Sequence, residues 1–390
     1  MANDPIPSGS LKVSALVVNY NSGDYAVNCI KSLQREAAHL KDRKITVECI
    51  VVDNASPRDQ QPFREAVAAL GERWIDQGWN AGYAAGVNRA FREAGGDLIL
   101  VVNPDVSFLT GSLGRLIDVL TGEGGVGAVG PNTWWDINRL IQFPPNIDPT
   151  LGDALYQTLA HLSRWWNRRY ALDRSREALK IWLSRGEVEV KLLSGGCVLV
   201  PRSVWEETGG MDTRFPLYYE DSDWFRRARR AGYRLLQVQD AHIAHFFNRS
   251  GVTDEGEAFA RYWTSRRRYY RKHYGLPGLW VARLTRRLSH GGLARRLKPG
   301  PMDRIRDLGE VTEPFTLDLS RGGGPYLLEL TQDPGFFMAG AIFGAGPEWR
   351  PSLDCWKVFG HTRFYLRGLD ISRRDRPVHL GTWSFLKVAD

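Results

Sequence analysis

The chain is poor in cysteine and in long apolar runs. Its 390 residues include four cysteines, which stand far apart without a CxxC pair or a zinc-like spacing. We therefore expect reduced core thiols, with neither a disulfide framework nor a structural zinc site. No run of 18 apolar residues occurs, and the initial Met-Ala-Asn-Asp-Pro is neither basic nor apolar. The expectation is a cytoplasmic protein that touches a membrane, if at all, peripherally at the inner face of the plasma membrane.

Acidic residues are missing from one stretch. Residues 258–300 hold twelve Lys or Arg and no Asp or Glu, and removing these charges from the net +8 leaves −4 for the remainder. The excess of positive charge therefore lies in one segment, and we do not expect a nucleic-acid-binding protein with a basic surface throughout. The same stretch alternates Arg with Tyr, Trp and Leu, as an interfacial helix does on an anionic membrane. Packing of a solvated helix against the rest of the protein is the other interpretation.

Apolar segments and helical patterns alternate along the first half of the chain. Strands are predicted at 12–19, 45–53, 73–76, 97–102 and 126–129, and helices at 25–40, 62–70, 84–93 and 113–120. This order predicts an α/β fold with a mostly parallel sheet, whose loops at the carboxyl ends of the strands carry function. Sheet character is expected again at 188–200 and 234–238, with helices near 203–208 and 222–231.

Composition divides the chain into three parts. We expect a catalytic domain over residues 1–257, with a helical insertion at about 151–186 that is rich in Trp and Arg. A basic amphipathic segment is expected over 258–304, in two helices broken at Gly275-Leu-Pro277. Short alternating segments separated by Gly, Pro and Asp then predict a small all-β, sandwich-like domain over 305–390.

The run Leu98-Ile-Leu-Val-Val-Asn-Pro-Asp105 delivers one carboxylate to the end of a buried strand. Pro104 lacks a backbone donor and fixes φ, so the strand must stop there. Asp105 then lies where open α/β sheets place their chemistry. On the tripeptide alone, a strand end followed by a turn is the favoured interpretation, and the rest of the chain must decide.

Seven short motifs follow one another in a fixed order. They are Val18-Asn-Tyr-Asn21, Val52-Asp-Asn-Ala-Ser56, Asn80-Ala-Gly-Tyr-Ala-Ala-Gly-Val-Asn88, Asn103-Pro-Asp105, Ser194-Gly-Gly-Cys197, Glu220-Asp-Ser-Asp223 with Arg227, and His245 with Ser250. The series resembles the inverting family 2 glycosyltransferases with the GT-A fold, and among them the rhamnosyltransferase-like group of bacterial surface-polysaccharide enzymes. The resemblance covers about residues 11–275.

The resemblance implies a nucleotide-sugar site at the first motifs. Asp53 is expected to accept a hydrogen bond from a pyrimidine or a ribose, although it could equally cap the next turn. Gly82 and Gly86 flank a helix start that suits a diphosphate or its ribose, or they serve helix packing alone. The full set expected to bind the nucleotide sugar is Asn19, Tyr20, Asp53, Asn54, Asn80, Gly82, Gly86, Asn88 and Asn103.

A divalent cation is the expected cofactor. Asp105 is the first ligand candidate and His245 the second, chosen over His242 because the family's histidine precedes a serine by five residues, as it precedes Ser250 here. Oxygen ligands with one imidazole suit Mg²⁺ or Mn²⁺. The family often carries two carboxylates at this place, whereas this chain has Asn103 in the first of them. A histidine of the core or the surface is the other interpretation of His245.

The acids at 220–223 open a helix, and the resemblance makes Asp221 the general base that takes the proton of the acceptor hydroxyl. A simple N-terminal cap cluster is the rival interpretation. Asp223 and Arg227, four residues apart, are expected to pair and support the cluster. The acceptor or sugar pocket is expected to include Gly195, Gly196, Tyr219, Glu220 and Trp224.

Together these features predict an inverting, metal-dependent, non-processive glycosyltransferase. The donor expected from the resemblance is dTDP-rhamnose, with UDP-galactofuranose, UDP-glucose or UDP-N-acetylglucosamine as alternatives. The acceptor would be a bacterial cell-surface glycan or its polyprenyl-diphosphate-linked precursor. A degenerate protein that only binds glycan or nucleotide sugar is the alternative of another class, suggested by the lone carboxylate at 103–105.

Overall fold

The computed structural model describes residues 10–122, 124–246, 255–289 and 304–389 with their side chains, apart from residues 255, 257 and 258. Their contacts divide them into two compact units. Unit 1 comprises the described residues up to Thr133, with Asn146–Pro149 and Ser184–Leu279. Unit 2 comprises Trp134–Pro145, Thr150–Leu183 and the described residues from Trp280 onward. The chain therefore passes between the units several times.

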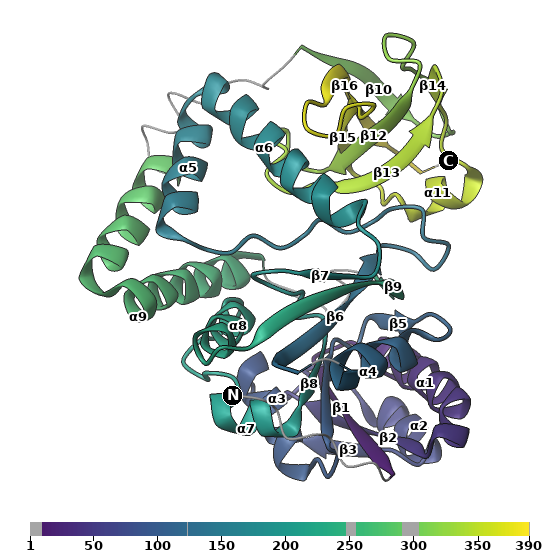
Figure 1. Cartoon of the computed structure of the whole chain (residues 1–390), viewed down its shortest axis with the longest axis vertical. Coiled ribbons are helices and arrows are strands. Elements are labelled where there is room, and N and C mark those ends of the chain that lie inside the picture. Colours follow the sequence, from purple (N-terminus) through teal and green to yellow (C-terminus); the bar gives the residue numbers. More distant parts are fainter. Residues whose placement is uncertain (1–9, 123, 247–254, 291–303, 390) are drawn as a thin grey trace. The chain divides into compact units, whose positions relative to one another are not determined.

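Unit 1 is built on a nine-stranded sheet of order β3-β2-β1-β4-β8-β6-β9-β5, with β7 paired to β9 (Figure 1). The strands β3, β2, β1 and β4 run parallel, whereas β4 with β8, β6 with β8, and β9 with both β5 and β7 are antiparallel. The strands are β1 (Leu11–Asn19), β2 (Ile45–Asp53), β3 (Arg73–Asp76), β4 (Leu98–Val102), β5 (Val106–Phe108), β6 (Val126–Trp134), β7 (Glu187–Glu189), β8 (Cys197–Pro201) and β9 (Arg234–His245).

Helices cover both faces of this sheet. They are α1 (Gly23–His39), α2 (Gln61–Ala69), α3 (Tyr83–Glu93), α4 (Ser112–Gly122), α7 (Arg202–Thr208), α8 (Glu220–Arg230) and the first part of α9 (Glu255–His290), and a 3₁₀ turn spans Lys41–Arg43. In β1, Val13, Ala15 and Val17 face the core under α1 and α4, while Leu16 and Val18 face the core under α3. Burial on both faces explains why the strand is a continuous apolar run.

Two differences from the expected elements affect the site. The strand β9 was expected to end at residue 238 but continues to His245, and β5, which was not expected, pairs with that extension. The expected sheet segment 188–200 is instead the short β7, a loop and β8. Polar side chains within β9 and the three-residue length of β5 hide both from periodicity.

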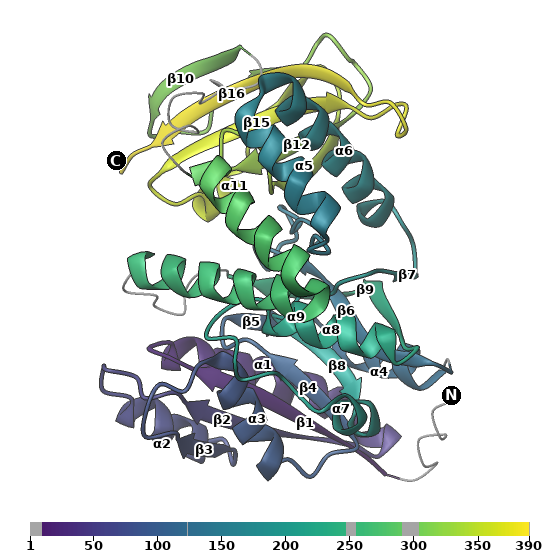
Figure 2. The same cartoon turned by 90° about the vertical axis from the view of Figure 1, so that its left-hand side faces the viewer.

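Unit 2 combines a sheet with two helices. Its five-stranded sheet has the order β10-β16-β15-β12-β13, and a separate two-stranded ribbon joins β11 and β14. Figure 2 shows α5 and α6 alongside this sheet. The elements are α5 (Leu151–Leu162), α6 (Arg164–Trp182), β10 (Ile305–Val311), β11 (Leu317–Asp318), β12 (Pro325–Thr331), β13 (Gly340–Ala345), β14 (Glu348–Trp349), α11 (Leu353–Val358), β15 (Arg363–Asp370) and β16 (Val378–Lys387).

A buried ion pair fastens α6 to the sheet of unit 2. Arg367 Nε donates to Glu329 Oε2 at 2.7 Å, and Ser175 Oγ of α6 donates to Glu329 Oε1 at 2.6 Å. All three side chains are almost fully buried. The α/β fold class with a separate β-rich C-terminal region is as the sequence predicted. The helices expected as an insertion in the catalytic domain pack, however, within the unit that contains the C-terminal strands.

The four cysteines are free and buried, as expected. The expected break of the basic segment also lies where the chain has it. Gly275 interrupts α9 with φ 64° and ψ −146°, a conformation that glycine adopts without strain. None of the helices in the described ranges is long and apolar enough to cross a membrane.

Candidate active site

The carboxyl ends of β1 and β2 are fastened to each other by polar side chains. Asn19 and Asp53 are register partners, and Asn19 Nδ2 donates to Asp53 Oδ1 at 2.7 Å. The Ser56 backbone N–H donates to Asp53 Oδ2 at 3.0 Å, which is the turn cap given above as the alternative for Asp53. Asn19 is fully buried, so its role in this structure is to hold Asp53 and the following loop. Tyr20 is half-buried beside it.

A second clasp joins the loop after β2 to the start of α3. Asn54 Nδ2 donates to Asn80 Oδ1 at 3.0 Å, and Asn54 Oδ1 accepts from the Ala81 backbone N–H at 2.9 Å. Gly82, with φ 86°, precedes the first helical residue, and its backbone N–H donates back to Asn80 Oδ1. The amides of residues 81 and 82 are therefore used within the loop, and a diphosphate would have to bind at other donors.

Two of the expected nucleotide-binding residues serve packing instead. A Cβ atom at Gly86 would lie 2.8 Å from a methyl group of Val18, so this glycine lets α3 pack closely on β1. Asn88 Nδ2 donates to the Met211 carbonyl at 2.7 Å, and its Oδ1 accepts from the Met211 N–H at 3.0 Å. This pair of bonds holds the loop between α7 and α8 on α3 and gives Asn88 a packing role in this structure.

Asp105 and His245 lie together between β4 and the paired strands β5 and β9. His245 Nε2 is 3.1 Å from Asp105 Oδ1, and both side chains are buried. Yet Asp105 Oδ1 accepts no hydrogen bond of good geometry from the described residues. A buried carboxylate oxygen in this position, with an imidazole nitrogen at contact distance, suits a shared divalent cation. His242 is half-exposed, and its carbonyl accepts hydrogen bonds from α4.

The rest of a metal shell would come from outside these two residues. No group of three or more His, Cys, Asp or Glu side chains in the described ranges is arranged to hold a metal ion. Asn103, where the family often has a carboxylate, accepts from the Tyr83 hydroxyl at 3.0 Å, and its Nδ2 lies 3.4 Å from His245 Nε2. With two protein ligands, the remaining positions are left to water or to the phosphates of a ligand.

Tyr83 is a site residue that the sequence reasoning missed. It is the first residue of α3, and burial, followed by the negative charges of Glu220, Asp221 and Asp105, holds the pKa of its hydroxyl far above the usual range. It therefore stays protonated and donates to Asn103. The sequence signal for Tyr83 is its place within the Asn80–Asn88 motif, where the glycines and asparagines are the more familiar ligand-binding residue types.

Glu220 and Asp221 begin α8 at a strained point of the backbone. The two preceding residues, Tyr218 and Tyr219, have φ of 62° and 68°, which are rare values for aromatic side chains. Burial raises the pKa of Asp221, although bonds from Ser222 oppose the shift. Burial and the neighbouring Asp221 raise the pKa of Glu220 to about 8, and Glu220 Oε2 finds no hydrogen-bond partner in the described parts of the chain.

The two glycines before β8 allow these reactive side chains to come close to the backbone. A Cβ atom at Gly195 would lie 2.6 Å from Asp221 Oδ2, and one at Gly196 would lie 2.8 Å from His245 Cε1. Gly196 also accepts from the Asn103 N–H at 2.9 Å, which ties its loop to the Asn-Pro-Asp turn. The sequence predicts a sugar pocket at these glycines, and in the structure they make room for Asp221 and His245.

Asp223 points into the interior rather than toward Asp221. It pairs with Arg227 Nε at 2.9 Å, as expected, and also with Lys272 Nζ at 2.7 Å and His273 Nε2 at 2.8 Å from α9. Arg227 in turn donates to the carbonyls of Thr208 and Gly210. Both residues therefore anchor α8.

The two aromatic residues expected in the acceptor pocket differ in exposure. Trp224 is buried and stacks on Trp205 with ring centroids 5.4 Å apart, so it belongs to the core and the expectation that it lines a sugar pocket is wrong. Tyr219 is half-buried, and its hydroxyl lies 3.3 Å from that of Tyr262. Tyr218 is half-exposed beside it and offers an aromatic face next to the acids.

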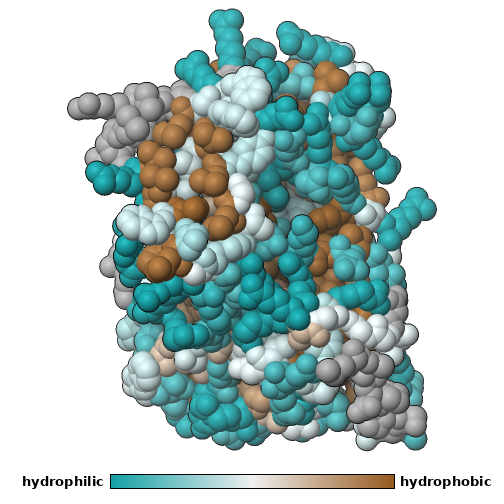
Figure 3. All heavy atoms as spheres, turned by 60° about the vertical axis from the view of Figure 1, so that its left-hand side comes forward, coloured by the Kyte–Doolittle hydropathy of each residue, from teal (hydrophilic) through white to brown (hydrophobic). Residues whose placement is uncertain are grey.

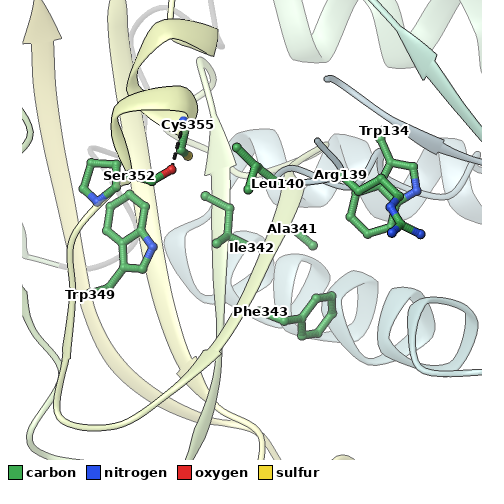
Figure 4. A pocket seen from close by; sticks show the side chains of 10 residues that line it. Trp134, Arg139, Leu140, Ala341, Ile342, Phe343, Trp349, Ser352 and Cys355 are labelled. Atoms are coloured by element: carbon green, nitrogen blue, oxygen red, sulfur yellow. Dashed lines mark hydrogen bonds between the residues drawn. The ribbon is translucent and has the colours of Figure 1, made fainter. Parts of the chain in front are cut away.

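Unit 2 contains a hollow of its own, shown in Figure 4. Ser352 in its wall caps α11 by accepting from the Cys355 N–H at 3.1 Å. The lining is mostly apolar and aromatic, with Arg139 as its charged side chain: Trp134, Arg139, Leu140, Ala341, Ile342, Phe343, Trp349, Pro351, Ser352 and Cys355. The clustered acids, the histidine and the strained backbone lie in unit 1, and we place the candidate active site there.

The chain is similar to known glycosyltransferases. The sequence model of the family described as Glycosyl transferase family 2 matches residues 14–176. The N-acetylglucosaminyl-diphospho-decaprenol L-rhamnosyltransferase of Mycobacterium tuberculosis is 26% identical over 245 residues, which cover 59% of this chain and 74% of that protein. A low-salt glycan biosynthesis hexosyltransferase of Haloferax volcanii is 26% identical over 237 residues, or 60% of this chain and 66% of that protein.

Solved structures similar to this fold include a mannosyltransferase from Pyrobaculum calidifontis in complex with GDP-Man and Mn²⁺. It has a TM-score of 0.44 and 16% identity, and the match covers 75% of this chain and 80% of that one. Staphylococcus aureus TarS 1–349 in complex with UDP has a TM-score of 0.40 and 15% identity, over 67% and 71% of the two chains.

Proposed function

Because residues 14–176 match the family 2 glycosyltransferases, we propose that this chain moves a sugar from a nucleotide-sugar donor to a glycan hydroxyl in one displacement that inverts the anomeric carbon. The observation that carries the proposal is the convergence of Asp221, Tyr83, Asp105 and His245. Asp221 would accept the proton, and Asp105 and His245 would hold a cation that stabilises the leaving group.

Asp221 is the proposed general base. Burial raises its pKa, which makes its carboxylate a better proton acceptor than an exposed aspartate, and Gly195 leaves space beside its Oδ2. In the step, the acceptor oxygen bonds to C1 of the sugar and the bond from C1 to the diphosphate oxygen breaks. The hydroxyl proton passes to Asp221, and the nucleoside diphosphate leaves with the bonding electron pair.

Asp105 and His245 are the residues that would hold Mg²⁺ or Mn²⁺. The unsatisfied Asp105 Oδ1 at 3.1 Å from His245 Nε2 supports this assignment. A bound cation would neutralise charge on the departing diphosphate. Asn103 links the two sides of this site, since its side chain accepts a hydrogen bond from Tyr83 and lies beside the imidazole of His245.

Glu220 is proposed to act as a neutral hydrogen-bond donor to the sugars. With a pKa of about 8 it carries a proton at neutral pH, and its buried Oε2 has no partner in the described part of the protein. A neutral acid there avoids a second negative charge next to Asp221, whose carboxylate must be the stronger acceptor.

The proposed donor is dTDP-rhamnose and the proposed acceptor a polyprenyl-diphosphate-linked glycan. Support comes from the Mycobacterium tuberculosis relative, whose name specifies rhamnosyl transfer to a decaprenol-linked sugar. UDP-galactofuranose, UDP-glucose and UDP-N-acetylglucosamine are the competing donors. Thermal shift with each nucleotide sugar, with and without Mn²⁺, should single out dTDP-rhamnose and show a larger shift with metal.

The central test is Asp221→Asn. Transfer should fall by about 10³-fold or more, because base catalysis supplies an enhancement of about 10²–10⁴-fold, while donor affinity in the presence of metal stays unchanged. Asp118→Asn is the matched control, since Asp118 is an exposed aspartate on α4 of unit 1. An Asp221→Asn protein that keeps its rate would eliminate the base assignment. Wild-type protein that binds the donor but never turns it over would favour the sugar-binding alternative.

A further inference from the structure

The first half of α9 uses its basic and aromatic side chains for packing. Arg266 is buried between the rings of Trp263 and Tyr270, at 5.2 and 5.0 Å from their centroids. Lys272 lies 2.7 Å from both Asp212 and Asp223. For residues 259–274 the described contacts therefore support packing within unit 1, which the sequence left open as an alternative to membrane contact.

The second half of α9 is different. After the break at Gly275, Leu279, Ala282 and Thr285 are buried at helical spacing. On the other face, Trp280 is 67% and Leu284 51% exposed. These two side chains are four residues apart and share one side of the helix.

The exposed face of α5 extends this apolar surface. Ser289 Oγ near the end of α9 lies 3.5 Å from Thr158 Oγ1, so the two helices lie side by side within unit 2. On α5, Leu155 is 44% and Leu159 is 41% exposed, again one turn apart. We call Leu155, Leu159, Trp280 and Leu284 the apolar patch. Figure 3 shows brown side chains gathered over these helices, with hydrophilic residues around them.

Arginine side chains border the patch, and acids are missing from its helix. Residues 276–290 contain no Asp or Glu, and Arg283, Arg286 and Arg287 are exposed. Arg164, Arg168 and Arg169, at the start of α6, are exposed as well, directly after the end of α5. Arg169 pairs with Asp173, whereas the arginines of α9 have no acid on their own helix segment. Large aliphatic and aromatic side chains next to arginines are typical of a helix that lies in a lipid interface.

We propose that the apolar patch and its arginines dock unit 2 on the surface of an anionic phospholipid bilayer. Leucine and tryptophan side chains would enter the boundary between headgroups and acyl chains, and the guanidinium groups would contact lipid phosphates. A symmetric dimer through the same patch would bring arginines of the two copies together, which disfavours a second copy as the occupant. This inference does not depend on the identity of the donor sugar.

The test is co-sedimentation of the full chain with vesicles. One set contains phosphatidylcholine alone, the other phosphatidylcholine with about one third phosphatidylglycerol, at low salt. The protein should bind the anionic vesicles, and more salt should weaken binding because exposed charges are screened. Trp280→Ser with Leu284→Ser should reduce partitioning about tenfold or more. Arg283→Gln with Arg287→Gln should reduce it about 25-fold, since each arginine near the surface contributes about fivefold.

Matched controls exist in the same unit. Leu353→Ser with Val378→Ser removes two other exposed apolar side chains, and Arg373→Gln with Arg374→Gln removes two other exposed arginines. These variants should bind vesicles as the wild type does. All variants should keep the wild-type melting temperature and the wild-type transfer rate to a water-soluble acceptor, which separates docking from catalysis.

Three results would overturn the proposal. The first is a wild type that fails to sediment with anionic vesicles, and the second is a patch variant that binds as well as the controls. The third is a wild-type dimer in sedimentation velocity that Trp280→Ser with Leu284→Ser dissociates, because the patch would then be the interface between two copies.

Discussion

Gly195 and Gly196 show how one missing side chain can organise a reactive centre. Each glycine leaves room for a different functional group, Asp221 in one case and His245 in the other. Because neither glycine has a positive φ, their value lies in space rather than in backbone freedom. The Ser-Gly-Gly-Cys motif is thus tied by geometry to both the proposed base and the proposed cation site.

Gly195→Ala should reduce transfer about as strongly as removal of the base itself. Its Cβ atom would lie 2.6 Å from Asp221 Oδ2, which forces the carboxylate or the loop to move. Overpacking of this kind costs about 1–3 kcal/mol of stability, so the variant should still fold. Steady-state kinetics and chemical denaturation check both parts.

Gly122→Ala is the control for that variant, because a Cβ atom there meets nothing within 4 Å. It should retain the rate of the wild type. A Gly195→Ala protein with normal kinetics would show that Asp221 has another place to go and would remove the steric argument.

Glu220 should make stability fall as the pH rises. Its pKa is about 8 in the folded protein and near 4.5 when exposed, so between these values the folded state binds a proton that the unfolded state lacks. The free energy of unfolding therefore decreases from about pH 5 to about pH 8. Glu220→Gln cannot ionise, so its free energy of unfolding should lack this pH dependence. Relative to the wild type, the free energy of unfolding of the variant should rise by more than about 1 kcal/mol between about pH 5 and about pH 8.

Urea unfolding of both proteins at several pH values checks this prediction. Parallel curves for the wild type and Glu220→Gln would mean that Glu220 titrates normally. The neutral donor role proposed for it would then have no basis.

At the residue scale, the sequence names Asp105, His245 and Asp221 as candidates because each belongs to a short motif of fixed order. It could not show that Trp224 packs in the core or that Asn88 bonds to Met211, since a motif does not tell which side chains turn inward. The paired bond of Asn88 with Met211 joins positions 123 residues apart, and no local pattern predicts it.

At the scale of elements, the helix α8 is positioned from its buried side. Asp223 forms ion pairs with Arg227 of the same helix and with Lys272 and His273 of α9. Burial alone would raise the pKa of Asp223, but the bonds from His273 and Lys272 and the charge of Arg227 lower it overall. The ion cluster around Asp223 therefore also fixes the position of Asp221, two residues earlier on the same helix, although Asp221 is not part of that cluster.

Asp223→Asn should destabilise the protein by about 3 kcal/mol, because it leaves buried cations without their counter-charge. The loss should shrink as the pH falls through the carboxyl's lowered pKa, since the stabilisation by an ionised aspartate is present above its ordinary pKa of 3.8 and disappears on protonation. Thermal and urea unfolding measure it.

Glu206→Gln is the matched control, since Glu206 pairs with Arg202 at the same spacing on an exposed helix face. Its effect should be several times smaller. Equal losses in the two variants would show that the Asp223 cluster contributes no more than a surface pair.

Most elements of unit 1 follow from periodicity, and the exceptions explain the site. The apolar strands β1, β2 and β4 are visible in the sequence because both of their faces are buried. The extension of β9 to His245 and its pairing with β5 depend on partners far along the chain. Sequence alone could therefore name His245 as a candidate, but could not place it 3.1 Å from Asp105.

At the scale of the whole molecule, the features described above are distributed over two units. Glu220, Asp221 and the proposed sites for a cation and a nucleotide belong to unit 1, whereas the apolar patch and the hollow of Figure 4 belong to unit 2. Composition alone placed a boundary near residue 304. It could not show that α5 and α6 pack with strands that follow about 150 residues later, because that association rests on long-range contacts such as Ser175 with Glu329.

Glu329→Gln should therefore weaken unit 2 selectively. Arg367 would be left buried without its counter-charge, at a cost of a few kcal/mol. Limited proteolysis should cut α6 and the C-terminal strands more readily, while donor binding in unit 1 stays unchanged. Loss of donor affinity together with unit 2 would mean that the two units unfold as one.

The discontinuity of unit 2 has a consequence for synthesis on the ribosome. Helix α6 emerges early, but Glu329 and Arg367, which fasten it, are made 154 and 192 residues after Ser175. At about 5–20 residues per second, the helix waits on the order of 10–40 s for its partners. During that interval Ala178, Leu179 and Trp182 of α6 lack the strands that bury them, so nascent chains of this protein should depend on holding chaperones more than the order of their domains would suggest.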